Sequence, residues 1–410
     1  MNVNHYPVLA MLALMGPFAS AQPNVDLELA QLKVEIARLE QRLAHIKAIV
    51  AQYTEAEPQS AVQPPPPVLY EEWATLRSRT SLAWSGDLRY MHETIDDHAL
   101  PIDHRHRLRA RGQIVAAIDD RMKLGFGVAT GDVKNDSANQ TLGDGFSRKP
   151  LELDLAYFDW RLSDAAHLLG GKMRNPFYRP ADHHLLYDDD LRPEGLALKF
   201  RQPSAFVNAS VFWTQDRGHT PDSMWWGLQA GYRLSPFDAF SLTTGASYYE
   251  TTHTRGYPPL FTPFSGQGNY LDASGNYLYG FSQWELFGEL TLERQGFRFT
   301  AFLDYVYNAV ADRFDEGLAA GLSFRRVSVS SPWTIAYTYQ DLQANAVVAA
   351  FTDSDFAAGT SDGSGSILKA AYEFPMGWTL ALRYITGVRG ESTGLRLDYD
   401  RLQVHLEFVY

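Results

Sequence analysis

From about residue 80 onward, apolar and polar residues alternate with a period of two, the pattern of half-buried β-strands. In residues 396–410 the apolar face consists of Leu402, Val404, Leu406, Phe408 and Tyr410, and the polar face of Arg401, Gln403, His405 and Glu407. Sixteen segments are predicted as strands: 82–93, 104–118, 121–131, 151–162, 166–175, 194–202, 204–215, 223–234, 238–251, 277–293, 296–309, 316–328, 332–342, 365–374, 377–388 and 396–410. The chain is therefore predicted to be largely all-β.

The connections between these strands differ systematically in length. Tight turns are predicted at 119–120, 163–164, 203, 235–236, 295–296, 331–332 and 374–375, and long loops at 132–150, 176–193, 252–275 and 343–364. A soluble sandwich also alternates, because it buries one face of each sheet. Sixteen strands in succession, with charges and small residues on one face and an aromatic C-terminal strand, favour a transmembrane β-barrel with a wide polar lumen. With an even number of strands, both termini of the chain are expected on the side of the barrel with the short turns, which is the periplasmic side.

Residues 1–79 follow a different pattern. Residues 1–21 are predicted to be a signal peptide, because the apolar run 8–15 precedes the small-residue sequence Ala19-Ser20-Ala21. Residues 24–53 carry heptads with Leu29, Ile36, Leu43 and Val50 at position a and Val25, Leu32, Leu39, Ile46 and Tyr53 at position d. This narrow stripe favours a periplasmic coiled coil over a helix packed on its own domain. Residues 54–79 form a Pro-rich linker, and residues 80–410 the barrel.

Composition narrows the function classes. The chain has 410 residues, and 13% of them are aromatic, enough for girdles at both lipid interfaces. It contains no run of roughly 18 apolar residues, which a membrane helix needs. Without cysteine it forms no disulfide, and its net charge of -12 argues against nucleic acid as a partner.

Four arginines on the second predicted strand form the clearest charge pattern. Arg105, Arg107, Arg109 and Arg111 share one face, opposite an apolar face that includes Leu108. Each arginine would cost about 2–4 kcal/mol near the lipid midplane, so the four are expected to face the lumen. The predicted pore-lining set is Arg89, Arg105, Arg107, Arg109, Arg111, Lys172 and Arg174. Two interpretations stay open: a wall that guides anions, or a structural ladder paired with carboxylates such as Asp87 or Asp154.

The third outer loop, residues 175–195, is predicted to fold inward and narrow the channel. Its candidate constriction residues are Arg179, Asp182, Asp188, Asp189, Asp190 and Glu194. The aspartates would then stand opposite the arginines, and a pore with opposed charges selects by size and field. The alternative is an ordinary solvated acidic loop.

Neither a metal site nor catalysis is predicted. The pair His183-His184 precedes three aspartates, 188–190, but this spacing matches no established ligand pattern. No Gly-x-Ser-x-Gly elbow occurs between a strand and a helix, so we expect no enzyme activity and no cofactor.

Several segments resemble one protein family. They are GDLRY (86–90), RLRARGQI (107–114), LGFGVATGD (124–132), NQTLGDGFSRK (139–149), LDLAYFDW (153–160), GGKMRNPFYRP (170–180) and DLRPEGLAL (190–198). These are similar to segments of the "putative porin" family of Gram-negative bacteria. The resemblance implies a signal peptide, a short coiled coil and a barrel that acts as a general diffusion porin of the outer membrane. It implies no particular substrate.

The expected function is passive diffusion of small hydrophilic solutes, with Arg105, Arg107, Arg109 and Arg111 facing Asp188, Asp189 and Asp190 at the constriction. The expected partners are outer-membrane lipid, two further copies in a homotrimer, and the barrel-assembly machinery, which would read the strand ending in Phe408 and Tyr410. Two alternatives are a membrane anchor for a tethering coiled coil and a substrate-specific channel for a sugar, phosphate or organic acid.

Overall fold

The computed structural model describes residues 81–98, 100–131, 137–261, 265–327 and 330–410, together with six residues between 33 and 47. These six, Lys33, Ala37, Glu40, Gln41, Ala44 and Lys47, are helical and exposed. The chain divides into two units, residues 1–69 and 70–410. The predicted signal peptide, the apolar heptad positions and the Pro-rich linker lie outside the described residues and stay predictions.

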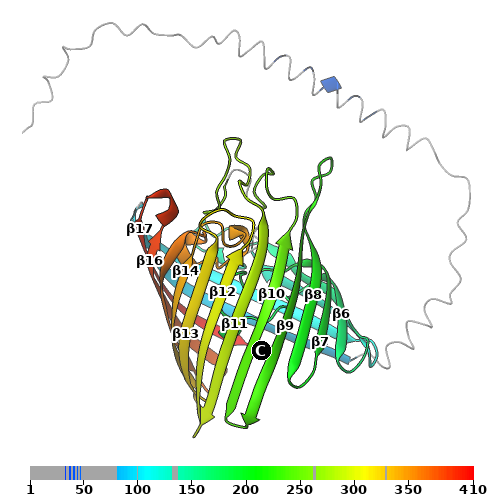
Figure 1. Ribbon diagram of the computed structural model, residues 1–410, viewed down its shortest axis with the longest axis vertical. Coiled ribbons are helices and arrows are strands. Elements are labelled where there is room, and N and C mark those ends of the chain that lie inside the picture. Colours follow the sequence, from blue (N-terminus) through cyan, green and yellow to red (C-terminus); the bar gives the residue numbers. More distant parts are fainter. Residues whose placement is uncertain are drawn as a thin grey trace, which may run out of the picture. The chain divides into compact units, whose positions relative to one another are not determined.

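The described residues of the second unit form a closed antiparallel barrel (Figure 1). Its strands are β1 (Ser81–Asp97), β2 (Asp103–Ala117), β3 (Met122–Thr130), β4 (Gln140–Thr141), β5 (Leu151–Arg161), β6 (Ala166–Lys172), β7 (Glu194–Arg201), β8 (Ala205–Gln215), β9 (Ser223–Phe237), β10 (Phe240–Thr251), β11 (Phe281–Arg294), β12 (Phe297–Asn308), β13 (Glu316–Arg326), β14 (Trp333–Leu342), β15 (Gly363–Glu373), β16 (Trp378–Arg389) and β17 (Leu397–Val409). Apart from the two-residue β4, these are the sixteen predicted strands. The barrel closes because β1 pairs with both β2 and β17.

One predicted turn was wrong. Ser235 and Pro236 were expected to end a strand, but both lie within β9, and the turn comes after Phe237. The pairing of β9 with β10 shifts in register between Phe240 and Leu242. Such a bulge removes the need for a ladder hydrogen bond from Pro236, which has no N–H, so the strand continues through the proline.

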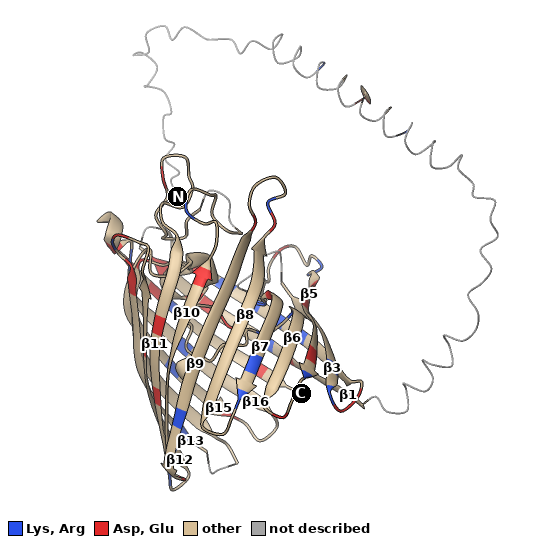
Figure 2. Cartoon of the chain, turned by 45° about the vertical axis from the view of Figure 1, so that its right-hand side comes forward, with Lys and Arg blue, Asp and Glu red and all other residues tan. Residues whose placement is uncertain are grey.

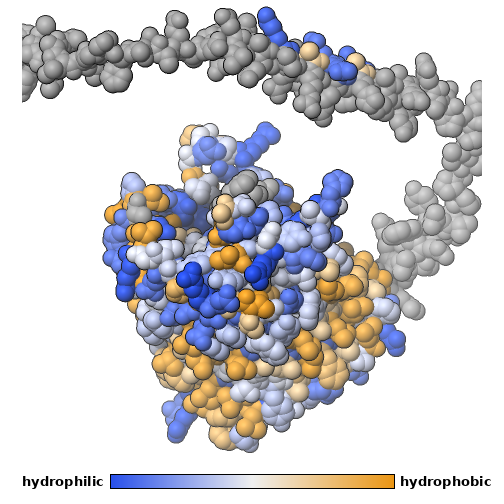
Figure 3. All heavy atoms as spheres, turned by 45° about the horizontal axis from the view of Figure 1, so that its top comes forward, coloured by the Kyte–Doolittle hydropathy of each residue, from blue (hydrophilic) through white to orange (hydrophobic). Residues whose placement is uncertain are grey.

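The outer wall carries apolar side chains, as the alternation predicted. In β17, Leu402 and Leu406 are exposed, whereas Arg401 and Gln403 are buried on the inner face. Exposed aromatic residues gather near both ends of the strands, with Trp84, Phe237 and Tyr410 at the short-turn end and Trp213, Trp226 and Trp284 at the loop end. Figure 3 shows hydrophobic residues over the lower wall and hydrophilic residues over the loop end. Such a band between aromatic girdles is typical of a barrel in lipid.

No helix among the described residues has the length and hydropathy needed to cross a membrane.

Inward-facing ion pairs brace the seam where the first and last strands meet. Arg401 of β17 contacts Glu93 of β1 at 2.6 Å, and Arg389 of β16 contacts Asp97 of β1 at 2.7 Å. At the same seam the C-terminal residue Tyr410 exchanges two backbone hydrogen bonds with Gly86, of 3.0 and 3.1 Å. The aromatic end of the chain is therefore part of the barrel closure. The charged positions of the strands can be followed in Figure 2.

Two long loops at the loop end of the barrel fold into the lumen; we call residues 173–193 the first inward loop and residues 343–362 the second inward loop. Their apolar residues join one buried cluster with inward side chains of the strands, including Phe177, Tyr187, Trp225, Tyr249 and Phe351. The sequence predicted an inward course for the first loop, but it identified the second only as long. Burial of the second loop requires partners for its backbone. Asn269 supplies them by donating to the carbonyls of Ala344 and Val347 at 2.6 and 2.8 Å and accepting from the N–H of Ala349 at 2.9 Å.

Candidate pore constriction

The four arginines of β2 lie on its inner face, and each is ion-paired. Their contacts are Arg105–Glu93 at 2.8 Å, Arg107–Glu93 at 3.3 Å, Arg109–Asp87 at 2.8 Å, Arg109–Glu407 at 2.6 Å, Arg111–Asp87 at 2.7 Å and Arg111–Asp190 at 3.0 Å. We call this row the arginine ladder. Asp87 is thus a partner, as one interpretation supposed, but Asp154 instead contacts Arg192 of the inward loop at 3.1 Å.

The upper part of the ladder lies beside the segment 137–141. The guanidinium of Arg107 donates to the carbonyl of Asn139 at 3.2 Å, and β4 pairs with β2 next to Arg107 and Leu108. Arg89 of β1 donates to Oδ1 of Asn139 at 2.8 Å. Arg107 and Arg89 therefore hold the loop between β3 and β5 against the wall.

Two further cations from the predicted set lie near the first inward loop. Lys172, the last residue of β6, contacts Glu194 at 2.8 Å, and Arg174 donates to Gln113 of β2 at 3.4 Å. Glu194 is the first residue of β7. It was predicted both as the start of the strand 194–202 and as a residue of the constriction loop, and the sheet pairs it with Lys172 across β6 and β7, so it belongs to the wall.

The acidic residues of the first inward loop separate into different environments. Asp190 pairs with Arg111 of the ladder, whereas Asp189 pairs with Arg179 of its own loop at 2.6 Å. Asp182 is exposed and ends the short 3-10 helix η1 (Pro180–Asp182). Asp188 is 6% exposed and accepts hydrogen bonds from the backbone N–H groups of Asp190 and Ser354. Of the three consecutive aspartates, only Asp190 contacts the ladder.

These environments shift the pKa values of the loop groups in opposite directions. Burial, together with Asp353 and Asp190, raises the pKa of Asp188 well above its usual range. Burial also opposes ionisation of Asp189, but Arg179 outweighs it and lowers the pKa of Asp189. Burial lowers the pKa of His184 to about 4, so this imidazole is neutral at pH 7.

The far side of the first inward loop is fixed to the opposite wall. The backbone of Tyr178 exchanges two hydrogen bonds with the Gln229 side chain of β9, at 2.6 and 2.9 Å. The hydroxyl of Tyr178 and the N–H of Ala181 both donate to Glu289 of β11, at 2.6 and 2.7 Å. The loop thus spans from the wall β9–β11 to Arg111 on β2.

Sequence reasoning missed a second set of charged residues. Asp353 and Asp355, from the second inward loop, pair with Arg383 of β16 at 2.5 and 2.8 Å. Asp355 also contacts Arg401 of β17 at 2.6 Å. Strand alternation placed Arg401 on the polar face, but no local motif links a wall arginine to an aspartate in the 343–362 loop.

Two cavities flank the Arg111–Asp190 pair. The larger, about 360 Å³, is lined by the charged residues Glu152, Asp154, Lys172, Asp190, Arg192 and Glu194 and by aromatic residues that include Trp225. The smaller, about 240 Å³, is lined by Asp87, Arg111, Gln113, Asp154, Arg174 and Glu407. Asp154 lines both cavities, so the Asp154–Arg192 and Arg111–Asp190 pairs stand where the two spaces approach each other.

A family model described as "Putative porin" matches residues 98–263 and 301–408, more than half of the chain. No curated protein matches the chain in sequence.

Solved outer-membrane proteins resemble the chain in fold. OprB of Pseudomonas putida is 11% identical with a TM-score of 0.53, over 83% of this chain and 96% of OprB. OmpF of Salmonella typhi, solved in complex with daunomycin, is 11% identical with a TM-score of 0.51, over 82% of this chain and 99% of OmpF. OmpT of Vibrio cholerae is 10% identical with a TM-score of 0.50, over 81% of this chain and 98% of OmpT.

Proposed function

The chain belongs to the putative porin family, and on that premise we propose that it forms a water-filled channel in the outer membrane for the passive diffusion of small hydrophilic solutes and ions. One observation carries this proposal. Inside a closed barrel, two charged cavities approach each other at Asp154, beside the ion pair between Arg111 and Asp190. A neck between two wet spaces, lined by fixed charges of both signs, is the arrangement that selects solutes by size and field.

In this proposal the solute path runs past the lower part of the arginine ladder. Arg111, Lys172 and Arg174 line the two cavities together with Asp190. Asp154 and Arg192 join them, although the sequence did not single them out as pore-lining. The geometry therefore favours Asp190, rather than Asp188 or Asp189, as the acidic side of the constriction.

The upper ladder has a different proposed role. Arg105 and Arg107 share the fully buried Glu93, and Arg107 also binds the loop segment at Asn139. Both contacts support a structural ladder at this height. The anion-guiding interpretation is thus kept for Arg111 and the charges around the two cavities.

Pairing of the charges leads us to expect weak selectivity between anions and cations. Arg111 and Asp190 compensate each other at close range, which leaves a transverse field with little net charge. Replacing one member should shift selectivity toward ions whose charge is opposite to that of the remaining member. Replacing both should restore the starting selectivity and remove the field.

Planar-bilayer recording with the purified oligomer tests the proposal. Wild type should open in conductance steps, and the reversal potential in a salt gradient should move toward cation selectivity in Arg111→Gln and toward anion selectivity in Asp190→Asn. Arg298→Gln is the matched control, because Arg298 pairs with Glu293 across the exposed β11–β12 turn. Folded protein that inserts without conducting would refute the channel. Unchanged reversal potentials in both variants would refute the assigned constriction.

We further propose that the working form is a homotrimer. In each copy, the first strand of the barrel would begin, and the last strand would end, on the periplasmic side. The heptads of residues 24–53 support self-association, and conductance steps in groups of three would support the trimer. For the C-terminal strand ending in Phe408 and Tyr410, we propose recognition by the barrel-assembly machinery.

A further inference from the structure

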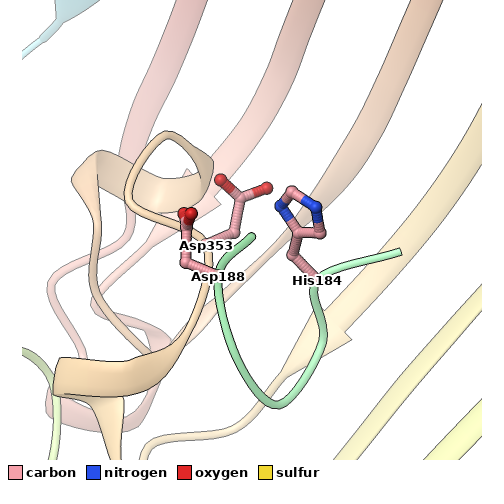
Figure 4. Close-up of side chains that lie close together, drawn as sticks. All are labelled: His184, Asp188 and Asp353. Atoms are coloured by element: carbon pink, nitrogen blue, oxygen red, sulfur yellow. The ribbon is translucent and has the colours of Figure 1, made fainter. Parts of the chain in front are cut away.

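Three potential metal ligands converge where the two inward loops meet. His184 and Asp188 come from the first loop and Asp353 from the second, and one ligand atom of each lies within 4.8 Å of the others. In Figure 4 the Asp353 carboxylate and the His184 ring face each other, with Asp188 beside them. No metal site was predicted from the spacing within residues 183–190, and Asp353 lies far from that segment in the sequence.

The contact between the loops holds these residues in place. The N–H of Asp188 donates to the carbonyl of Phe351 at 2.6 Å, and the Thr352 hydroxyl donates to the carbonyl of Leu185 at 2.9 Å. Asp353 is fixed from the other side by Arg383 of β16. The cluster therefore joins positions 165 residues apart on a backbone that is already fixed.

The charge balance of the cluster is incomplete. Among the described residues, Asp189, Asp190, Asp353 and Asp355 each have an arginine within ion-pair distance. Asp188 has none in that part of the chain, although it is 94% buried and lies beside another carboxylate. Its two backbone hydrogen bonds orient the carboxylate but bring no full positive charge. A buried carboxylate without a counter-ion is costly, and a cation at this point would compensate it.

A second potential ligand of the cluster is the His184 imidazole, which has no hydrogen-bond partner among the described residues. Within the described parts of the chain, no hydrogen bond or ion pair is formed by the His184 ring, whereas the neighbouring His183 contacts Gln340 at 2.7 Å. The His184 ring thus has a nitrogen without a hydrogen-bond partner on the side of the two carboxylates, and each carboxylate keeps free lone pairs after its own hydrogen bonds.

We propose that His184, Asp188 and Asp353 bind a divalent cation of the zinc type, which joins the two inward loops of the lumen. An imidazole with two carboxylates is a donor set that Zn²⁺ accepts, whereas Ca²⁺ takes oxygen ligands. A cation centred among three atoms that lie within 4.8 Å of one another is at most about 2.8 Å from each. Zn²⁺ binds at about 2.0–2.2 Å, so the side chains close in by at most roughly 0.7 Å on binding, and water completes the shell.

Isothermal titration of metal-free, full-length protein in detergent tests this site without reference to conductance. Zn²⁺ should bind once per chain, with Ca²⁺ and Mg²⁺ unable to displace it at similar concentrations. His184→Gln and Asp353→Asn should each weaken binding by roughly 10- to 100-fold or more, since loss of a ligand exceeds the effect of losing an outer partner. Asp182→Asn, an exposed acid of the same loop, and His183→Gln are the matched controls and should bind as wild type does.

A folding readout keeps the test decisive. Each variant is first shown to be folded by its heat-modifiable mobility in gels. Asp188→Asn should also lose zinc binding, and its folded mobility shows that the loss is one of a ligand, although the amide can accept only one of the two backbone hydrogen bonds. Absence of zinc binding by folded wild type would overturn the proposal. So would equal binding by wild type, His184→Gln and Asp353→Asn, which would place the metal elsewhere.

Discussion

Replacement of Glu93 by glutamine should destabilise the barrel at its seam. Glu93 is completely buried on β1 and accepts hydrogen bonds from Arg105, Arg107 and Arg401 at 2.8, 3.3 and 2.6 Å. Its single negative charge thus connects β1 to β2 on one side and to β17 on the other. The Glu93→Gln change keeps the size of the side chain, removes the charge and replaces one of the two acceptor oxygens by an NH2 group.

The expected cost follows from what each arginine retains. Arg105 keeps Asp103 at 3.3 Å, and Arg401 keeps Asp355 at 2.6 Å. Arg107 retains no carboxylate within ion-pair distance among the described residues. At an effective dielectric constant of about 20, one charge pair 4 Å apart is worth about 4 kcal/mol before solvation. Because two of the three arginines keep a partner, the expected loss in the free energy of unfolding is that of one broken buried pair, about 3–5 kcal/mol.

Urea titration of the protein in detergent micelles, followed by tryptophan fluorescence, measures this loss. Glu293→Gln is the control, because Glu293 also contacts an arginine, Arg298 at 2.5 Å, but on an exposed turn. That surface pair should contribute about 0–1 kcal/mol. The double variant Glu93→Gln/Arg107→Gln should recover part of the loss, since it removes the cation that keeps no carboxylate partner among the described residues. Equal losses in Glu93→Gln and Glu293→Gln would refute the argument that the buried charge braces the seam.

Three other changes test separate parts of the structure. Phe351→Ala removes a buried ring whose centroid lies 5.2 Å from that of Trp225, and it should lower the free energy of unfolding by about 3–5 kcal/mol and increase open-channel noise in bilayers. Unaltered noise would mean that the second inward loop does not bound the solute path. Leu286→Arg places a charge on the exposed face of β11 and should reduce the free energy of folding into lipid vesicles by about 2–4 kcal/mol, with Leu286→Ala as the control for size. A reduction no larger than that of Leu286→Ala would mean that this face does not meet lipid. Deletion of residues 22–68 should leave single-channel conductance unchanged and reduce the oligomer in gels, and loss of conductance would contradict a separate role for the coiled coil.

Strand positions could be predicted because their determinant is local. In β11, Trp284 and Leu286 are exposed while Gln283 and Glu285 are buried, so each residue reports its own face. Every strand of a barrel has one face toward lipid and one toward the lumen, so the weak alternation of each single strand supports the same prediction. The error at Pro236 arose where one residue normally ends a strand and a bulge accommodated it instead.

The contacts at the proposed constriction could be predicted only in part. Alternation placed Arg111 on the inner face, and the order of the loops placed Asp190 in the lumen, so their contact followed from two local facts. The pairing of Asp353 with Arg383 depends on how the second inward loop packs after the barrel closes. Nothing near either residue encodes that contact, because its determinants are the buried apolar residues of the same loop and the carbonyl-binding side chain of Asn269.

The same loops that narrow the lumen also supply the charges that neutralise its wall. Asp190 reaches Arg111 from the first loop, and Asp355 reaches Arg383 and Arg401 from the second. If either loop left the lumen, it would uncover arginines in a low-dielectric wall, so ion pairing adds to apolar packing in holding the loops inside. The narrowness of the channel and the near-balance of its charges therefore have one physical cause. It follows that a substitution which frees a loop should widen the path and raise anion selectivity together, whereas a substitution at the neck alone should change selectivity without widening it.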